Sequence, residues 1–289
     1  MIEIRHLYKS FGKQEVLADV NLTIEDDKII GLLGRNGVGK TTLLHIIASH
    51  LIKREGEVLL DGQQVLENPV RTSQIAYIPE DGFGTDMKLK ELFDYGRRLY
   101  PNWNEELFQE MIELFGLDVR KKFSKLSRGM RTMTCLTMGL ASGARFTLFD
   151  EPSLGMDAAN RFHFYQKLMS EFEKGGRTFL VSTHIIDEVA NLFEEVVILK
   201  DKQVMLKEEV PTLLERGFSV RGSREELDAI AFTQRHIGTE TFGNSEIRSY
   251  YGELPADAKQ RIQEAGLDWE SLSLQTLFVH LTEGENHVR

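Results

Sequence analysis

One segment of the sequence constrains the fold more than any other, because it matches the pattern G-x-x-x-x-G-K-[ST] in full. An apolar run at residues 28–33 precedes the segment and predicts a buried strand, and another at residues 41–52 predicts a helix after it. A strand-to-helix turn that binds nothing is the alternative interpretation, and the complete motif in this context argues against it. The segment, with the threonine that follows it, consists of Gly34, Arg35, Asn36, Gly37, Val38, Gly39, Lys40, Thr41 and Thr42.

This segment predicts a binding site for phosphate groups. Its glycines let backbone amides turn inward around a phosphate, and the following helix presents its positive end to the same anion. We expect Lys40 to reach the β- and γ-phosphates of a nucleoside triphosphate and the hydroxyl of Thr41 to bind Mg²⁺. The sequence therefore predicts a protein that binds ATP or a similar nucleotide.

An acidic pair far downstream predicts hydrolysis in addition to binding. The mostly apolar residues 146–149 predict a buried strand, and Asp150 and Glu151 follow directly at its carboxyl end. Asp150 is placed to hold Mg²⁺, and Glu151 is a candidate general base for the attacking water. Alone, such a pair favours a simple strand end, but beside a phosphate loop it favours an ATPase.

Several further motifs resemble those of the ATP-binding cassette superfamily, in particular the nucleotide-binding subunits of ABC transporters. The resemblance covers roughly residues 1–207. The motifs are the signature loop at Leu126-Ser127-Arg128-Gly129-Met130, the D-loop at Ser153-Leu154-Gly155-Met156-Asp157, the Q-loop at Tyr77-Ile78-Pro79-Glu80, the switch histidine His184, and the aromatic residue Phe11.

The resemblance implies a role for each of these positions. Phe11 would stack on adenine, and His184 would contact the γ-phosphate and orient the water. Glu80 would be a ligand of Mg²⁺, beside Thr41 and Asp150. On their own, a phenylalanine near a turn and a histidine at a helix start are as consistent with a structural role.

The signature loop implies a second subunit. Ser127 and the amide of Gly129 at a helix start form an anion site. In the family's fold this loop, with Asp157 of the D-loop, faces the nucleotide of another subunit. One phosphate loop per chain therefore implies a dimer, homomeric or heteromeric, with two composite sites.

Three residues depart from the family's usual pattern. Glu80 replaces glutamine in the Q-loop, and Arg128 and Met130 replace a glycine and a glutamine in the signature. Similar substitutions occur in exporter-type cassettes of bacteria. Most of the neighbouring cationic side chains are expected to be a solvated helix face, with Arg128 as the exception that can face the partner's γ-phosphate.

The composition of the chain argues against several other classes of function and structure. The net charge of −10 argues against nucleic acid as a main partner. The single cysteine, Cys135, excludes an intramolecular disulfide and a cysteine-rich metal site. No run of about 18 apolar residues predicts a membrane span, and the charged N-terminus does not predict a signal peptide.

These observations and the resemblance together imply an ATPase at the cytoplasmic face of the membrane that drives a separate membrane-spanning permease, with export as the expected direction. The expected docking surface is the groove around residues 80–92. The alternative is a soluble or regulatory cassette ATPase of the translation or repair type. Translation-type cassettes usually carry two phosphate loops, chromosome-associated types need long heptad repeats, and neither feature is present.

The pattern of elements predicts an α/β fold of two parts. Residues 1–207 are expected to form the cassette, with a mixed sheet core, an antiparallel β subdomain and a helical insertion at about 86–143. Within it, residues 185–195 are expected to form a helix. Residues 208–289 are expected to form a small α/β appendage with helices at 224–234 and 269–284, acting as a ligand sensor, a structural extension or a dimer contact.

Overall fold

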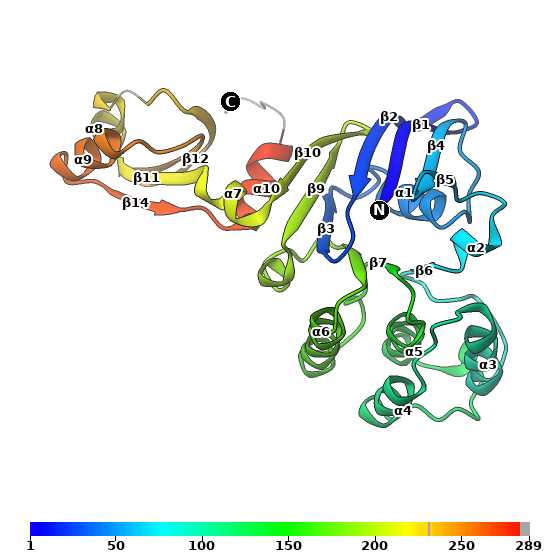
Figure 1. The fold of residues 1–289 in the computed structure, drawn as a ribbon. Helices are drawn as coiled ribbons and strands as arrows, with labels where there is room; N and C mark the ends of the chain where they lie inside the picture. Colours follow the sequence, from blue (N-terminus) through cyan, green and yellow to red (C-terminus); the bar gives the residue numbers. More distant parts are fainter. Residues whose placement is uncertain (231, 284–289) are drawn as a thin grey trace. The chain divides into compact units, whose positions relative to one another are not determined.

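The computed structural model describes residues 1–230 and 232–283 and divides into two units (Figure 1). Residues 1–184 and 195–207 form the first unit, and residues 185–194 and 208–289 form the second. The sequence-based boundary after residue 207 therefore differs at one place, because the segment 185–194 groups with the second unit.

Two sheets form the framework of the first unit. An antiparallel sheet has the strand order β2-β1-β4-β5, and a six-stranded sheet has the order β10-β9-β3-β8-β7-β6. The pairings of β9 with β3, β3 with β8, β8 with β7 and β7 with β6 are parallel. The strands are β1 (Ile2–Phe11), β2 (Gln14–Ile24), β3 (Ile29–Gly34), β4 (Glu55–Leu60), β5 (Gln63–Gln64), β6 (Ile75–Ile78), β7 (Phe146–Asp150), β8 (Thr178–Ser182), β9 (Glu195–Lys200) and β10 (Gln203–Glu209).

A continuous apolar core joins both sheets to the helix α1 (Lys40–Ile47). Every residue of β3 and of β7 is buried, which explains why β3 is apolar throughout and why β7 is mostly apolar, with Thr147 and Asp150 as its polar residues. Helix α1 adds Leu43, Leu44 and Ile47 to the same core. Because β3 runs directly into α1 through the glycine loop, this packing fixes the position of the loop.

A helical segment lies between β6 and β7 in the sequence. It contains α3 (Leu89–Leu99), α4 (Glu105–Leu114), a short 3₁₀ turn at Phe123–Lys125 and α5 (Arg128–Ala141), which lie together in Figure 1. Helix α5 approaches the central sheet closely at Gly139, where a Cβ atom would come within 2.7 Å of Ile78 and 2.8 Å of Phe149. This contact needs a glycine, and it attaches the helical segment to the sheet.

A buried arginine holds the carboxyl end of α5. Arg177 is 7% exposed and donates hydrogen bonds to the carbonyls of Leu140 (2.8 Å) and Gly139 (3.1 Å) and to Thr147 Oγ1 (3.1 Å). Its ion-pair partner Glu171, 3.5 Å away, lies on α6 (Ala158–Glu173). Burial lowers the pKa of Arg177 to about 10, so the group remains charged at neutral pH.

The second unit has a core of its own around an antiparallel sheet of order β12-β13-β11-β14. The element order β11-α8-β12-β13-α9-β14 with this strand order is the ferredoxin-like split βαβ arrangement. The elements are α7 (Val210–Glu215), β11 (Gly217–Ser223), α8 (Arg224–Ala229), β12 (Arg235–Phe242), β13 (Ser245–Tyr251), α9 (Ala256–Glu264), β14 (Asp268–Ser271) and α10 (Leu274–Thr282).

Four expectations about helices were wrong in part or in full. The helix expected at residues 41–52 ends at Ile47, where α1 gives way to a turn. Residues 185–195 form no α-helix; only Ala190–Leu192 is a 3₁₀ turn, and Glu195 already belongs to β9. The helical spacing of the apolar residues there is satisfied by successive short turns, such as the bonds from Val189 N to Ile186 O and from Leu192 N to Val189 O. These short turns do not continue into an α-helix.

In the second unit, two expected helices are shorter than predicted. Helix α8 ends at Ala229 instead of continuing to 234, and Ala231 lies outside the described residues. The expected helix at 269–284 begins only at Leu274, where Ser273 caps it, because the preceding residues pair with β11 as strand β14. The end of that expectation, Gly284, also lies outside the described residues.

Strand β12 was missed entirely. Its signal in the sequence is the two-residue Gly-Asn connection between Phe242 and Ser245, which is typical of a β-hairpin. Among the described helices, none is long and apolar enough to cross a lipid bilayer.

Replacing Arg177 with alanine is expected to lower the free energy of unfolding by about 3–5 kcal/mol, because Glu171 and two helix carbonyls would lose their buried partner. Chemical denaturation would measure the loss. The matched control is Arg54→Ala, since Arg54 is 55% exposed beside Glu55 and should contribute less than about 1 kcal/mol. Equal losses in both variants would contradict this role for Arg177.

Candidate functional site

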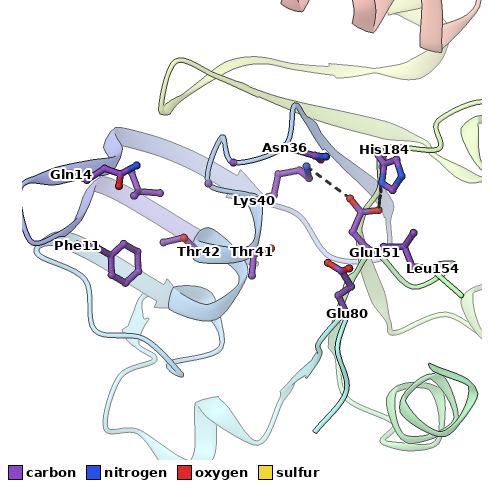
Figure 2. Close-up of a pocket in the computed structure, with 13 residues that line it drawn as sticks. Phe11, Gln14, Asn36, Lys40, Thr41, Thr42, Glu80, Glu151, Leu154 and His184 are labelled. Atoms are coloured by element: carbon purple, nitrogen blue, oxygen red, sulfur yellow. Dashed lines mark hydrogen bonds and ion pairs between the residues drawn. The ribbon is translucent and has the colours of Figure 1, made fainter. Parts of the chain in front are cut away.

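A pocket of about 600 Å³ opens where the glycine loop meets the carboxyl ends of the parallel strands. Figure 2 shows Phe11 and Gln14 at one end, Glu151 and His184 at the other, and Lys40 between them. The pocket is lined by Phe11, Gln14, Val16, Asn36, Gly37, Gly39, Lys40, Thr41, Thr42, Glu80, Glu151, Leu154 and His184.

The loop adopts a conformation that glycine allows. Gly37 and Gly39 have φ angles of 79° and 114°, in the region that side chains disfavour. A Cβ atom on Gly39 would also lie 2.8 Å from the side chain of Leu17 and 3.2 Å from the carbonyl of Val16. Gly39 is the residue before α1, so the loop delivers its backbone amides to the start of that helix.

Lys40 places a buried positive charge at the centre of the pocket. The side chain is 7% exposed, and its ammonium donates to the carbonyl oxygen of Gly34 at 2.7 Å. Its second partner is Glu151, with 3.9 Å between Nζ and Oε1. Burial lowers the pKa of Lys40, while the nearby carboxylates, Glu151 first, oppose that shift.

Glu151 is held in place from two sides. Its Oε2 accepts hydrogen bonds from Nδ1 of His184 at 2.8 Å and from the backbone amide of His184 at 3.3 Å. The backbone of Glu151 has a φ angle of 48°, a left-handed conformation that costs a residue other than glycine about 1–3 kcal/mol. A backbone bond from its amide to the carbonyl of Ser182 (3.0 Å) holds it there.

Asp150 lies beneath the pocket surface and is 2% exposed. Ser182 donates to its Oδ1 at 2.9 Å, and Tyr77 donates to its Oδ2 at 3.2 Å. Burial, with the neighbouring Asp150 charge, raises the pKa of the Tyr77 hydroxyl well above its usual value, so this hydroxyl remains a donor.

Glu80 lines the pocket from the loop after β6. Burial raises the pKa of Glu80, and the negative charges of Asp81, Asp150 and Glu151 add to that shift. Arg128, 3.4 Å away, acts in the opposite direction. Two of the three departures from the family's pattern, Glu80 and Arg128, thus form an ion pair within one chain.

Phe11 is 49% exposed at the other end of the pocket. It ends β1 at a turn through Gly12, and the ammonium of Lys9 lies 4.9 Å from its ring centroid. An exposed aromatic face at this position can stack on a base. Gln14 and Val16, at the start of β2, also line the pocket and were not expected there. Leu154, named above only as part of the D-loop, lines it as well.

Not every residue singled out from the sequence lines this pocket. Gly34, Arg35 and Val38 belong to the loop but are not among the lining residues. Ser127, Gly129 and Asp157 also lie elsewhere. Ser127 caps α5 by accepting from the amide of Met130, Asp157 caps α6, and a Cβ on Gly129 would lie 2.8 Å from the carbonyl of Gly155.

The possible metal ligands near the loop suit a hard cation that binds together with phosphate. Thr41, Glu80 and Asp150 offer only oxygen atoms, the ligands that Mg²⁺ prefers. Within residues 1–230 and 232–283, no group of three or more His, Cys, Asp or Glu side chains could hold a metal ion alone. Mg²⁺ is usually bound by one or two carboxylates together with substrate phosphates.

A buried strand, a glycine loop and a helix that hold a lysine beside an acidic pair define the class of P-loop nucleoside triphosphatases. Residues 17–154 match the ABC transporter family. The ABC transporter ATP-binding protein YtrB of Bacillus subtilis (strain 168) is 32% identical over 205 residues, which cover 71% of this chain and 70% of YtrB. The chain belongs to the ATP-binding proteins of the ABC transporter family, and it is an ATPase of that family.

Two further comparisons agree with this assignment. The taurine import ATP-binding protein TauB of Escherichia coli O157:H7 is 29% identical over 223 residues, covering 75% of this chain and 87% of TauB. A solved dimeric, post-hydrolysis ATP-binding cassette bound to ADP and Pi has a TM-score of 0.63 at 23% identity, covering 73% of this chain and 99% of that one. The predicted cassette fold is thereby confirmed.

Replacing Lys40 with alanine is expected to weaken ATP binding about 100-fold, because the charge-assisted bonds that this ammonium makes to phosphate contribute about 1.5–3 kcal/mol each. Isothermal titration calorimetry with ATP would measure the change. Lys202→Ala is the control, since Lys202 is 49% exposed and pairs with Glu15. Unchanged ATP affinity in Lys40→Ala would remove this lysine from the binding site.

Proposed function

We propose that this chain is the ATP-hydrolysing subunit that drives a separate membrane permease, and that it acts at the cytoplasmic face of the membrane. The observation that carries the proposal is the row Lys40–Glu151–His184, which runs from the middle of the pocket to the end opposite Phe11. A nucleotide whose base stacks on Phe11 would direct its phosphates along the glycine loop toward this row.

The residues of the pocket divide the chemistry among them. Lys40 and the loop amides would hold the β- and γ-phosphates, and Thr41, Asp150 and Glu80 would hold Mg²⁺. Bound Mg²⁺ supplies neutralisation of phosphate charge. Glu151 would accept the proton of the attacking water, and its two bonds from His184 keep its carboxylate oriented for that step.

When ATP binds, the ammonium of Lys40 is expected to move from the carboxylate of Glu151 toward the γ-phosphate. Its ammonium lies 3.9 Å from one oxygen of Glu151, a distance that leaves only a weak contact. A γ-phosphate carries more negative charge than a carboxylate and would attract the lysine more strongly. The carboxylate of Glu151 would then be free to bind water.

The proposal includes a second ATP-binding subunit. Ser127, Gly129 and Asp157 do not line the pocket of their own chain. Ser127 and Asp157 cap the starts of α5 and α6, and Gly129 lies in the first turn of α5, where backbone amides can bind an anion. Closure of two cassettes would bring these residues to the nucleotide of the partner, with Arg128 beside them. The dimeric form of the related cassette structure supports this arrangement.

A second cavity, of about 520 Å³, supports the proposed permease contact. It lies between the core and the helical segment, and most of its lining is apolar. Met87, Tyr95 and Leu99 line it and are 47%, 59% and 43% exposed, which is typical of a surface that binds an apolar partner. We propose that an apolar helical segment of the permease docks there, around residues 80–92.

We propose export as the direction of transport, on the basis of Glu80, Arg128 and Met130, which resemble exporter-type cassettes. The relative TauB is an import protein, so the proposal of export depends on these three residues alone. Residues 208–289 are proposed as an accessory domain, which their separate sheet and core support.

Replacing Glu151 with glutamine is expected to reduce ATP hydrolysis at least about 100-fold while ATP binding persists, because the amide cannot accept the proton of water. Size-exclusion chromatography with ATP should then show trapped dimers. Glu113→Gln, on the exposed side of α4, is the matched control. Turnover at the wild-type rate in Glu151→Gln would exclude Glu151 as the base.

A further inference from the structure

The hydroxyl of Tyr77 connects two cavities that share no lining residue. On one side it donates to Oδ2 of Asp150, at 3.2 Å. On the other side it contacts Nε2 of His45, at 3.1 Å. His45 and the ring of Tyr77 line the second cavity, whereas Asp150 lies beneath the nucleotide pocket.

The chemistry of the three groups fixes the direction of these hydrogen bonds. A carboxylate only accepts, so the single hydroxyl proton of Tyr77 is used toward Asp150. The hydroxyl must therefore accept the second bond, and Nε2 of His45 must carry the proton that is donated. The result is a directed row, His45 to Tyr77 to Asp150.

The row joins three elements that build the site. His45 lies on α1, the helix that opens at the phosphate loop, Tyr77 lies on β6, and Asp150 ends β7. Tyr77 is 6% exposed, and β6 pairs in parallel with β7 beside it. Its ring also packs against His45 and His50, with centroid distances of 4.5 Å and 5.5 Å.

Both oxygens of Asp150 are thereby occupied by one fixed donor each. Ser182 holds Oδ1 and Tyr77 holds Oδ2, so the carboxylate cannot rotate without breaking a buried hydrogen bond. Each carboxylate oxygen still has a free lone pair for a further contact. Such partners commonly orient the ligands of a metal ion.

We infer that Tyr77 is a positioning residue that orients Asp150 for Mg²⁺ and links this carboxylate, through His45, to the wall of the second cavity. The inference rests on the proposed function, in which Asp150 holds Mg²⁺. Tyr77 itself touches neither nucleotide nor metal in this account. Its effect is on the geometry of Asp150 alone.

The test uses the full chain and measures nucleotide affinity twice, once with Mg²⁺ and once with EDTA. In Tyr77→Phe, the ATP affinity in EDTA should stay within about twofold of the wild type, because the phosphate loop is unaltered. The gain in affinity on adding Mg²⁺ should fall about tenfold, as is typical when a partner of a metal ligand is lost. Tyr95→Phe is the control, since Tyr95 lines the same cavity but is 59% exposed.

A second variant, His45→Ala, leaves β6 unaltered and removes the donor to Tyr77, together with the ring contact between the two side chains. It should reduce the Mg²⁺-dependent gain in the same direction, by about threefold. If Tyr77→Phe does not fold, the Mg²⁺-dependent gain in ATP affinity of His45→Ala tests the inference in its place.

Three results would distinguish a failure of the inference about Tyr77 from a failure of the proposed function. An unchanged gain on adding Mg²⁺ in the folded variants would overturn the inference. An equal loss of affinity with Mg²⁺ and with EDTA would also overturn it, because it would assign Tyr77 a purely structural role. Failure of the wild-type chain to bind ATP under either condition would instead refute the proposed function.

Discussion

The buried ammonium of Lys40 is the interaction on which the rest of the site depends. A charge with 7% exposure is costly unless it is paired, and its partners here are one backbone carbonyl and a carboxylate 3.9 Å away. This pairing is incomplete, because an ammonium has three donors. A phosphate group would complete it, which explains how a chain with a net charge of −10 can offer a site for an anion.

The fold supplies the geometry that this charge needs. Strands β3, β8, β7 and β6 run parallel, so their carboxyl ends meet at one edge and bring the glycine loop, Ser182, Asp150 and the loop of Glu80 together. Full burial of β3 and β7 makes this edge rigid. The strained backbone of Glu151 is tolerated because the surrounding strands hold it.

The sequence predicted the local parts of this site, and the resemblance to the cassette family added Glu80 and His184, but side-chain contacts that depend on the order of the strands were not predicted. The phosphate loop, the strand before Asp150 and the helical segment follow from short-range patterns. The contact of Tyr77 with Asp150 was not predicted, because it requires β6 to lie beside β7 although 73 residues separate the two side chains. For the same reason the expected helix at 185–195 was wrong and β14 was missed: turns and strand pairing set by the tertiary fold outweighed the helical spacing.

The most direct test of this account is an experimental structure of the wild-type chain with Mg²⁺ and a non-hydrolysable ATP analogue. The account predicts that a γ-phosphate oxygen lies between Lys40 and Glu151, so that the two side chains separate beyond their present 3.9 Å. It also predicts that Asp150 keeps its bonds to Tyr77 and Ser182. A nucleotide bound elsewhere, with the Lys40–Glu151 pair intact, would contradict the account.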